Sequence, residues 1–148
     1  MSPQTIVRIA QRGDIDSIVE MDPIAKQEPD RRKFIAHAVA AGHCWVAMEA
    51  EDALALIGYG VLDHSFFEHD FIPLIVVKSS ARRRGVATAI MQALELQCQG
   101  GKLFTSTNTS NFAMRQLLRQ LGFIRSGQID NLDDGDPELV FVKFRSSL

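Results

Sequence analysis

The feature that most restricts the fold is an apolar run that gives way to basic residues within a few positions. Residues 71–78 read FIPLIVVK, and positions 74–77 are continuously apolar, which is typical of a strand covered on both faces. Three small residues follow, then arginines at 82–84, and Gly85 opens a helical pattern. The segment therefore predicts a central strand, a turn and a helix, the unit from which α/β folds are built.

The hydrophobic pattern predicts further strands and helices on both sides of this unit. Strand patterns cover residues 5–10, 43–49, 53–62, 102–107, 123–129 and 138–144, and helical patterns cover 15–21, 31–40, 86–97 and 110–121. Asp14 and Ser110 are the expected caps of the first and last helices. The order β-α-α-β-β-β-α-β-α-β-β indicates a mixed sheet, and a chain of 148 residues fits a single domain of residues 1–148.

Composition and charge restrict the class of partner. The net charge is -2, so a broad basic surface for nucleic acid is not indicated and any anion site must be local. Cys44 and Cys98 lie far apart without a CxxC or His-rich neighbourhood, which predicts neither a disulfide framework nor a metal site. The sequence shows no basic N-terminal segment followed by an apolar stretch and no run long enough to cross a bilayer. We therefore expect a cytoplasmic protein without membrane association.

The arginine-glycine turn has the chemistry of a phosphate site. Amides in the first turn of a helix have no partner inside that helix, and the helix dipole adds partial positive charge there. Gly85 lacks the Cβ that would keep a phosphate from the backbone, while the neighbouring guanidinium groups are suited to phosphate oxygens. The segment contains neither GxxxxGK[ST] nor GxGxxG. A solvated surface turn is the alternative, but the apolar strand before the arginines and the glycine after them favour an anion site.

Two ordered motifs connect this turn to a known family. Residues 82–87 read RRRGVA, an instance of [QR]-x-x-G-x-[GA] after a buried strand, and residues 111–123 read NFAMRQLLRQLGF, a helix with an early asparagine and a closing Gly-Phe. In this order and separation the chain resembles the GNAT superfamily of acyltransferases over nearly its whole length. The resemblance implies an α/β fold with a mixed, mostly antiparallel sheet of six to seven strands and about four helices. It also implies that the central strands 71–78 and 103–107 splay apart.

The resemblance further implies that acetyl-CoA binds as co-substrate, without a metal. Main-chain groups of Ile75 and Val77 would pair with the pantetheine arm, amides from Arg83 to Thr88 would hold the pyrophosphate, and an amide near Val77 would stabilise the oxyanion. Asn111 would help to place the pantetheine or the neighbouring strand, although an ordinary role at a helix start is the alternative. The implied cofactor-binding residues are Ile75, Val76, Val77, Arg82, Arg83, Arg84, Gly85, Val86, Ala87, Thr88 and Asn111.

The catalytic groups are less well defined, because two positions depart from the family pattern. Leu118 stands where many members carry a tyrosine general acid, and Ser106 where some carry a glutamate base. The one tyrosine of the chain, Tyr59, is expected in the core with its hydroxyl tethered. The candidate bases are acidic or histidine residues just before the central strand, which could equally form a loop rim: Glu68, His69 and Asp70.

These observations lead to a main hypothesis and an alternative. We expect an N-acetyltransferase that moves an acetyl group from acetyl-CoA to a small-molecule or peptide amine by direct attack in a ternary complex, with no nucleic-acid partner. Because Leu118 and Ser106 replace family positions, the alternative is a CoA-binding sensor or interaction module without turnover. The acidic turn at 130–138 is expected to be a solvated loop, or else to attract a cationic amine. The acceptor is left open; a homodimer is one expectation, since family members often pair through sheet edges.

Overall fold

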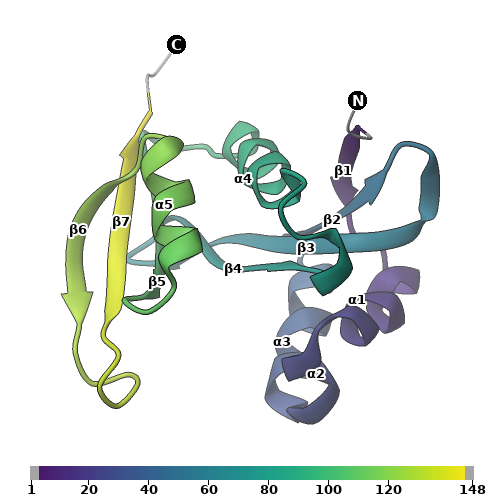
Figure 1. Ribbon diagram of the computed structural model, residues 1–148, viewed down its shortest axis with the longest axis horizontal. Helices are drawn as coiled ribbons and strands as arrows, with labels where there is room; N and C mark the ends of the chain where they lie inside the picture. Colours follow the sequence, from purple (N-terminus) through teal and green to yellow (C-terminus); the bar gives the residue numbers. More distant parts are fainter. Residues whose placement is uncertain (1–3, 146–148) are drawn as a thin grey trace. The chain divides into compact units, whose positions relative to one another are not determined.

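The seven strands are ordered β1-β2-β3-β4-β5-β7-β6 in a computed structural model that describes residues 4–145 (Figure 1). The β4–β5 pairing is parallel, whereas the β1–β2, β2–β3, β5–β7 and β6–β7 pairings are antiparallel. The expected mixed, mostly antiparallel sheet is thus confirmed. The described residues form five α-helices, one more than the sequence predicted.

The bounds of the elements agree with the sequence pattern at most positions. The strands are β1 Thr5–Ile9, β2 Cys44–Glu49, β3 Asp52–Phe66, β4 His69–Val77, β5 Lys102–Asn108, β6 Ile124–Ile129 and β7 Glu138–Phe144. The helices are α1 Ile15–Met21, α2 Pro23–Gln27, α3 Pro29–Ala40, α4 Val86–Leu96 and α5 Phe112–Gln120, with short 3-10 turns at Arg12–Asp14 and Ser79–Ala81.

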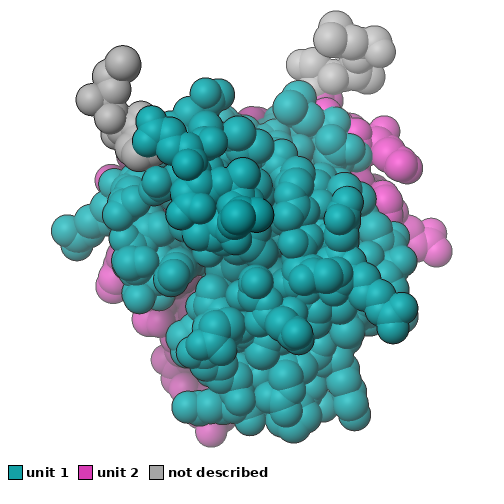
Figure 2. All heavy atoms as spheres, turned by 90° about the vertical axis from the view of Figure 1, so that its right-hand side faces the viewer, with its two compact units in different colours: residues 1–62, 74–97 teal, residues 63–73, 98–148 magenta. Residues whose placement is uncertain are grey.

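The structure divides into two compact units, and each is discontinuous in sequence (Figure 2). Unit 1 comprises the chain up to residue 62 together with 74–97, and unit 2 comprises 63–73 together with the chain from residue 98. Strands β3 and β4 contribute residues to both units, so the single domain of residues 1–148 stays a prediction. In unit 1, α1, α2 and α3 lie on one side of the strands and α4 on the other (Figure 1).

Helix α2, which the sequence pattern does not predict, begins at Pro23, where a helix end is expected. Pro23 occupies the first position of α2, where its missing N–H costs nothing because that amide would have no helical partner. Asp22 caps the helix by accepting hydrogen bonds from the amides of Ile24 at 2.9 Å and Ala25 at 3.3 Å. A proline after a capping residue therefore starts a new helix here.

The hairpin between β3 and β4 is longer than the sequence indicated. We expected strands at 53–62 and 71–78, but β3 continues to Phe66 and β4 begins at His69. The turn between them consists of Phe67 and Glu68, whose φ angles are 51° and 65°. Such left-handed turns are normally signalled by Asn-Gly, so Phe-Glu gave no turn signal in the sequence.

The apolar run of β4 is less covered than predicted. Strand β4 is central, being the fourth of seven, but positions 74–77 are all half-buried rather than enclosed on both faces. Its ladder with β5 joins Asp70, Phe71 and Ile72 to Leu103, Phe104 and Thr105, although β4 continues to Val77 and β5 to Asn108. A ladder of three residue pairs agrees with the expectation that strands 71–78 and 103–107 splay apart.

Asp14 does not cap α1 with its side chain, contrary to the prediction. Its carboxylate instead accepts two hydrogen bonds from Arg8, at 2.8 and 2.9 Å, and one from the amide of Gln11 at 2.7 Å. The hydrogen bonds from Arg8 hold the pKa of Asp14 below its ordinary value, against the opposing effect of partial burial. The residue therefore ties β1 to the turn before α1.

This ion pair predicts a pH-dependent contribution to stability. Because the pKa of Asp14 is lower in the folded protein than in the unfolded chain, the contribution is present above about pH 4 and is lost as the pH falls through the folded-state pKa. The melting temperature of Asp14→Asn should lie below that of the wild type near neutral pH, and the difference should shrink on acidification. A difference that stays constant between about pH 6 and about pH 3 would contradict this assignment.

Two glycines of β3 allow α4 to approach the sheet closely within unit 1. A Cβ on Gly60 would lie 2.7 Å from Ile90 Cγ2, and one on Gly58 would lie 3.0 Å from Ile90 Cδ1. Ile90 is fully buried, so neither contact can be relieved toward solvent. The close contact fixes α4, and with it the turn that precedes α4.

Gly60→Ala is expected to lower the free energy of unfolding by about 1–3 kcal/mol, because the added methyl group overpacks the contact with Ile90. Urea denaturation measures the change. Gly13→Ala is the control, since nothing lies within 4 Å of a Cβ at that position. Equal stability of the two variants would show that α4 can move aside.

Candidate functional site

The turn before α4 has free main-chain donors. Gly85 is the residue that precedes α4, with φ at 78°, and the first helical bond runs from the amide of Ala89 to the carbonyl of Gly85 at 3.0 Å. Within residues 4–145, the amides from Arg83 to Thr88 donate to no protein acceptor. No atom lies within 4 Å of a Cβ built on Gly85. The turn is therefore open, and its amides meet the requirement for an anion site at a helix N-terminus.

The backbone of this turn is strained at a non-glycine residue. Arg83 has φ at 65°, a left-handed conformation that costs a residue with a Cβ about 1–2 kcal/mol. Gly85 adopts a similar angle without that cost. Turns that contain left-handed residues can direct successive amides toward one anion. The left-handed angles at Arg83 and Gly85 are of the kind found in such turns.

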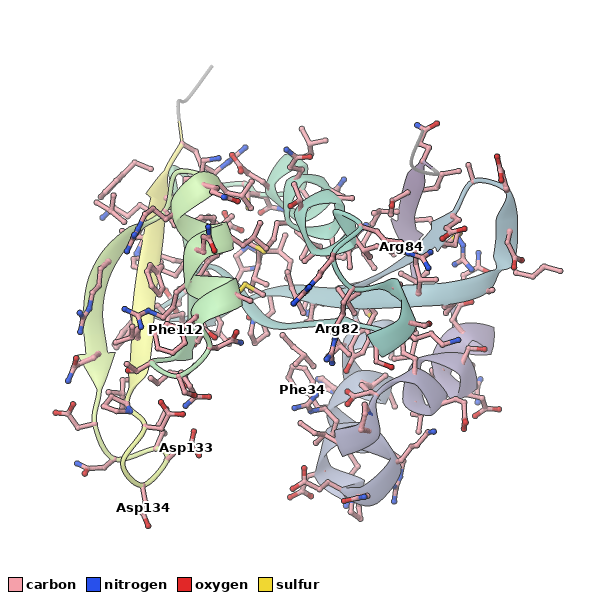
Figure 3. The ribbon with its side chains drawn as sticks, in the orientation of Figure 1. Phe34, Arg82, Arg84, Phe112, Asp133 and Asp134 are labelled. Atoms are coloured by element: carbon pink, nitrogen blue, oxygen red, sulfur yellow. The ribbon has the colours of Figure 1, made fainter. Side chains whose placement is uncertain are left out.

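The three arginines of the turn differ in their surroundings. Arg84 Nη1 lies 2.6 Å from Glu49 Oε1, and Arg84 Nη2 donates to the carbonyl of Ser80 at 3.1 Å. The side chains of Arg82 and Arg83 are exposed and make no ion pair with the described part of the chain. In Figure 3 the labelled side chains of Arg82 and Arg84 leave the turn in different directions. Two of the three guanidinium groups are therefore available to a ligand.

The remaining predicted cofactor contacts occupy two further elements. Ile75, Val76 and Val77 form the last part of β4. They are half-buried, so this part of the strand is partly accessible to a ligand. Val86, Ala87 and Thr88 form the first turn of α4. All of these residues belong to unit 1, whereas Asn111 belongs to unit 2.

Asn111, rather than Ser110, caps α5. Asn111 Oδ1 accepts a hydrogen bond from the amide of Met114 at 3.2 Å. Ser110 instead donates through its amide and hydroxyl to the carboxylate of Asp136, at 3.0 and 2.6 Å. The expected cap at Ser110 was wrong because an acidic residue 26 positions away competes for its hydroxyl.

Asn111→Ala is expected to lower the free energy of unfolding by about 1 kcal/mol, because the amide of Met114 loses its acceptor. Asn111→Ser, which can accept the same hydrogen bond, should stay within about 0.5 kcal/mol of the wild type. Urea denaturation of both variants measures the cap. If the serine variant loses as much as the alanine variant, the capping bond is not what Asn111 contributes.

The acidic turn is held in place by its own carboxylates. Asp133 accepts a hydrogen bond from Asn108 Nδ2 at 2.9 Å, in addition to the bonds that Ser110 donates to Asp136. Figure 3 shows Asp134 at the tip of the loop, directed outward. The turn is thus a structured hairpin loop that supports the start of α5, which agrees with the expectation of a solvated loop.

The three candidate bases are not equivalent. Asp70 is 2% exposed, and its Oδ2 accepts hydrogen bonds from the amides of Gln99 at 3.1 Å and Gly100 at 2.9 Å. Its Oδ1 lies 2.9 Å from His64 Nε2, at ion-pair distance but without hydrogen-bond alignment. Asp70 is therefore buried, with Oδ2 bound to two amides and Oδ1 beside the ring of His64.

Glu68 and His69 are exposed at the start of β4. Glu68 lies in the left-handed hairpin turn, and the ring of His69 lies 5.5 Å from the ring of Phe104. His64 was missed in the sequence analysis. Its position six residues before Asp70, on the other strand of a hairpin, is the feature that could have predicted their contact. No described residues form a group of three or more His, Cys, Asp or Glu suited to a metal ion.

The two positions that depart from the family pattern differ in burial. Leu118 is fully buried, and Ser106 is half-buried on β5. Tyr59 is also fully buried, its hydroxyl donates to Asp22 Oδ2, and burial together with that hydrogen bond raises its pKa. Tyr59 is therefore a tethered core residue, as the sequence predicted.

Two cavities lie away from the turn, both in unit 1. One, of about 590 Å³, lies between α1 and the start of β3, and the other, of about 690 Å³, lies between α1 and α3. They share Asp16 and Glu20 in their linings, and neither lining includes a residue of the turn at 82–88. None of the helices formed by the described residues has the length and hydrophobicity of a membrane span.

Comparison with known proteins identifies the family. The family model described as "Acetyltransferase (GNAT) family" matches residues 14–123. The crystal structure of a GNAT-family acetyltransferase from Bacillus cereus ATCC 10987 is 35% identical, with a TM-score of 0.88 over 97% of this chain and 99% of that chain. No curated protein matches the chain.

Two more distant structures share the fold. The ribosomal-protein-S18-alanine N-acetyltransferase from Escherichia coli is 14% identical, with a TM-score of 0.80 over 98% of this chain and 96% of that chain. The structure of yncA from Salmonella typhimurium, solved with its cofactor acetyl-CoA, is 13% identical, with a TM-score of 0.76 over 97% and 95%. With a family model across most of its length and a close structural relative over nearly all of it, this chain belongs to the GNAT family of acetyltransferases.

Proposed function

We propose that this protein is an acetyl-CoA-dependent N-acetyltransferase that acts on an amine by direct attack in a ternary complex. The observation that carries the proposal is the turn at 82–88, whose amides from Arg83 to Thr88 have no acceptor within the described chain. A structural neighbour that holds acetyl-CoA and another that is named as a protein N-acetyltransferase support the co-substrate and the reaction class.

The turn and the end of β4 would divide the binding of acetyl-CoA between them. Amides from Arg83 to Thr88 would bind the pyrophosphate, and the exposed guanidinium groups of Arg82 and Arg83 would add charge-assisted hydrogen bonds. The backbone of Ile75 and Val77 would hold the pantetheine arm, and the N–H of Val77 or its neighbour would donate to the oxygen on which negative charge develops. Asn111 would support the neighbouring strand through its cap of α5.

When bound, acetyl-CoA supplies an activated thioester. The amine nitrogen forms a bond to the carbonyl carbon as the C–S bond breaks, one proton leaves the nitrogen, and the sulfur takes up a proton. Tyr59 is buried and tethered to Asp22, and Leu118 has no ionisable group, so neither serves as the acid. Among the candidate bases, the exposed Glu68 and His69 are better available than the buried Asp70, whose Oδ2 already accepts hydrogen bonds from two amides.

Because no side chain is fixed as the general acid, alignment of the amine with the thioester must provide most of the rate enhancement. General acid–base catalysis contributes about 10²- to 10⁴-fold, whereas alignment of two reactants contributes more. The buried Leu118 also supports the second candidate function, a CoA-binding sensor or interaction module without turnover. The two functions share the binding step and differ in whether free thiol is produced.

The proposal is tested by two measurements on the purified protein. Calorimetric titration with acetyl-CoA should show saturable binding to one site per chain. Thiol release should then be followed with small amines, polyamines, basic peptides and peptides with a free N-terminus. Release with any of these amines supports the transferase, and binding without release supports the sensor. No binding of acetyl-CoA would overturn both.

A further inference from the structure

Arg84 differs from Arg82 and Arg83 because its guanidinium already has partners within the chain. Nη1 lies 2.6 Å from Glu49 Oε1, and Nη2 donates to the Ser80 carbonyl at 3.1 Å. The Glu49 side chain is 24% exposed and that of Arg84 is 48% exposed, so this contact is partly shielded from water. Two donors of the Arg84 guanidinium therefore already have acceptors within the chain.

The partners of Arg84 come from two separately fixed parts of unit 1. Glu49 is the last residue of β2, where it is paired with Thr5 of β1 and Asp52 of β3. Ser80 lies in the short turn that follows β4. Arg84 therefore connects the end of β2 to the segment that leads into α4.

The backbone around Arg84 needs such a connection. Residues on both sides of it, Arg83 and Gly85, have φ angles of 65° and 78°. Glycine tolerates this conformation, but arginine rarely adopts it unless the surrounding structure holds it there. Two contacts at the residue between them oppose relaxation of the turn. The same turn carries the free amides from Arg83 to Thr88.

We propose that Arg84 is a positioning residue whose contacts with Glu49 and Ser80 hold the turn in its anion-binding conformation before acetyl-CoA arrives. Arg82 and Arg83, and not Arg84, then provide the guanidinium groups that contact the pyrophosphate. This inference rests on the proposed function. A turn ordered in advance avoids part of the entropy cost of ordering it on binding, so the pair raises affinity without touching the ligand.

The charge of Glu49 distinguishes positioning from direct binding by Arg84. A carboxylate beside an anion site repels the anion, and it also occupies the arginine. If Arg84 bound phosphate itself, removing the charge of Glu49 would free Arg84 and strengthen binding. If Arg84 acts through the turn, the same change weakens binding although it makes the site more positive.

The experiment is calorimetric titration of acetyl-CoA into the wild type, Glu49→Gln, Arg84→Gln and the double variant. Each single change should weaken binding about five- to tenfold, and the double variant should bind no more weakly than Arg84→Gln, because Arg84→Gln already removes the ion pair with Glu49. Arg84→Lys should also weaken binding, since an ammonium cannot bridge both partners as the planar guanidinium does. Glu51→Gln is the control: Glu51 is exposed and its side chain forms no ion pair within residues 4–145, so affinity should not fall.

A glycine at position 83 provides the complementary test. Because glycine adopts the left-handed conformation without strain, Glu49→Gln should change affinity less than about twofold in an Arg83→Gly background. Melting temperatures show that each variant is folded. If the wild type binds acetyl-CoA and Glu49→Gln binds it equally or more tightly, this inference is overturned and the proposed function is not. A wild type that does not bind acetyl-CoA would overturn the proposed function together with it.

Discussion

Gly85→Glu is expected to weaken acetyl-CoA binding about a hundredfold or more, which corresponds to about 2.8 kcal/mol. Two effects combine. A residue with a Cβ at φ 78° costs about 1–2 kcal/mol, so the free turn relaxes from the binding conformation and acetyl-CoA must restore that conformation when it binds. A carboxylate about 4 Å from a phosphate adds repulsion of about 1 kcal/mol in water and about 4 kcal/mol at a partly shielded site. Titration calorimetry measures the loss directly.

Two further variants separate these effects. Gly85→Ala introduces the strain without the charge and should weaken binding about five- to tenfold. Gly135→Glu is the matched control, because Gly135 has φ at 71°, no atom lies within 4 Å of its Cβ position, and it lies in the loop between β6 and β7. The control should lose stability but keep its affinity for acetyl-CoA. Affinity of Gly85→Glu within about threefold of the wild type would remove the turn from the binding site.

The turn could be predicted from the sequence because its determinants are local. The apolar strand, the three arginines, Gly85 and the periodic start of α4 fall within 71–88, and the φ of 78° at Gly85 is one that glycine adopts readily. The hydrophobic pattern then predicted the order of the elements along the chain and a mixed sheet, which the family resemblance also implied. The different surroundings of the three arginines could not be foreseen, since Glu49 lies 35 positions before Arg84.

Prediction from the sequence failed where a side chain has a partner far away along the chain. Asp70 was grouped with Glu68 and His69 because the three are adjacent, but its carboxylate binds amides 29 and 30 positions later. Asp14 and Ser110 have the residue types of helix caps, but Arg8 and Asp136 compete for them. Capping preference is a local tendency of about 1 kcal/mol, and a charged partner brought in by the fold overrides it.

Asp22 shows the largest such effect, because it combines a cap with a buried polar network in unit 1. The side chain is 1% exposed. Oδ1 accepts hydrogen bonds from the amides of Ile24 and Ala25, while Oδ2 accepts from Tyr59 and, at 2.8 Å, from Arg31. Four donors thus converge on one carboxylate that joins β3, the start of α2 and α3. The sequence indicated only that Asp22 precedes a proline.

Asp22→Ala is expected to lower the free energy of unfolding by about 3–5 kcal/mol, because it leaves the Arg31 guanidinium and the buried Tyr59 hydroxyl without an acceptor. Tyr59→Phe removes one donor and leaves the carboxylate its other three, so it should cost about 1–2 kcal/mol. Asp16→Ala, an exposed change on α1, should stay within about 0.5 kcal/mol of the wild type. Urea denaturation gives all three values. A loss below about 1.5 kcal/mol for Asp22→Ala would mean that water or a rearranged Arg31 replaces the carboxylate, and that the network does not hold the helices to β3.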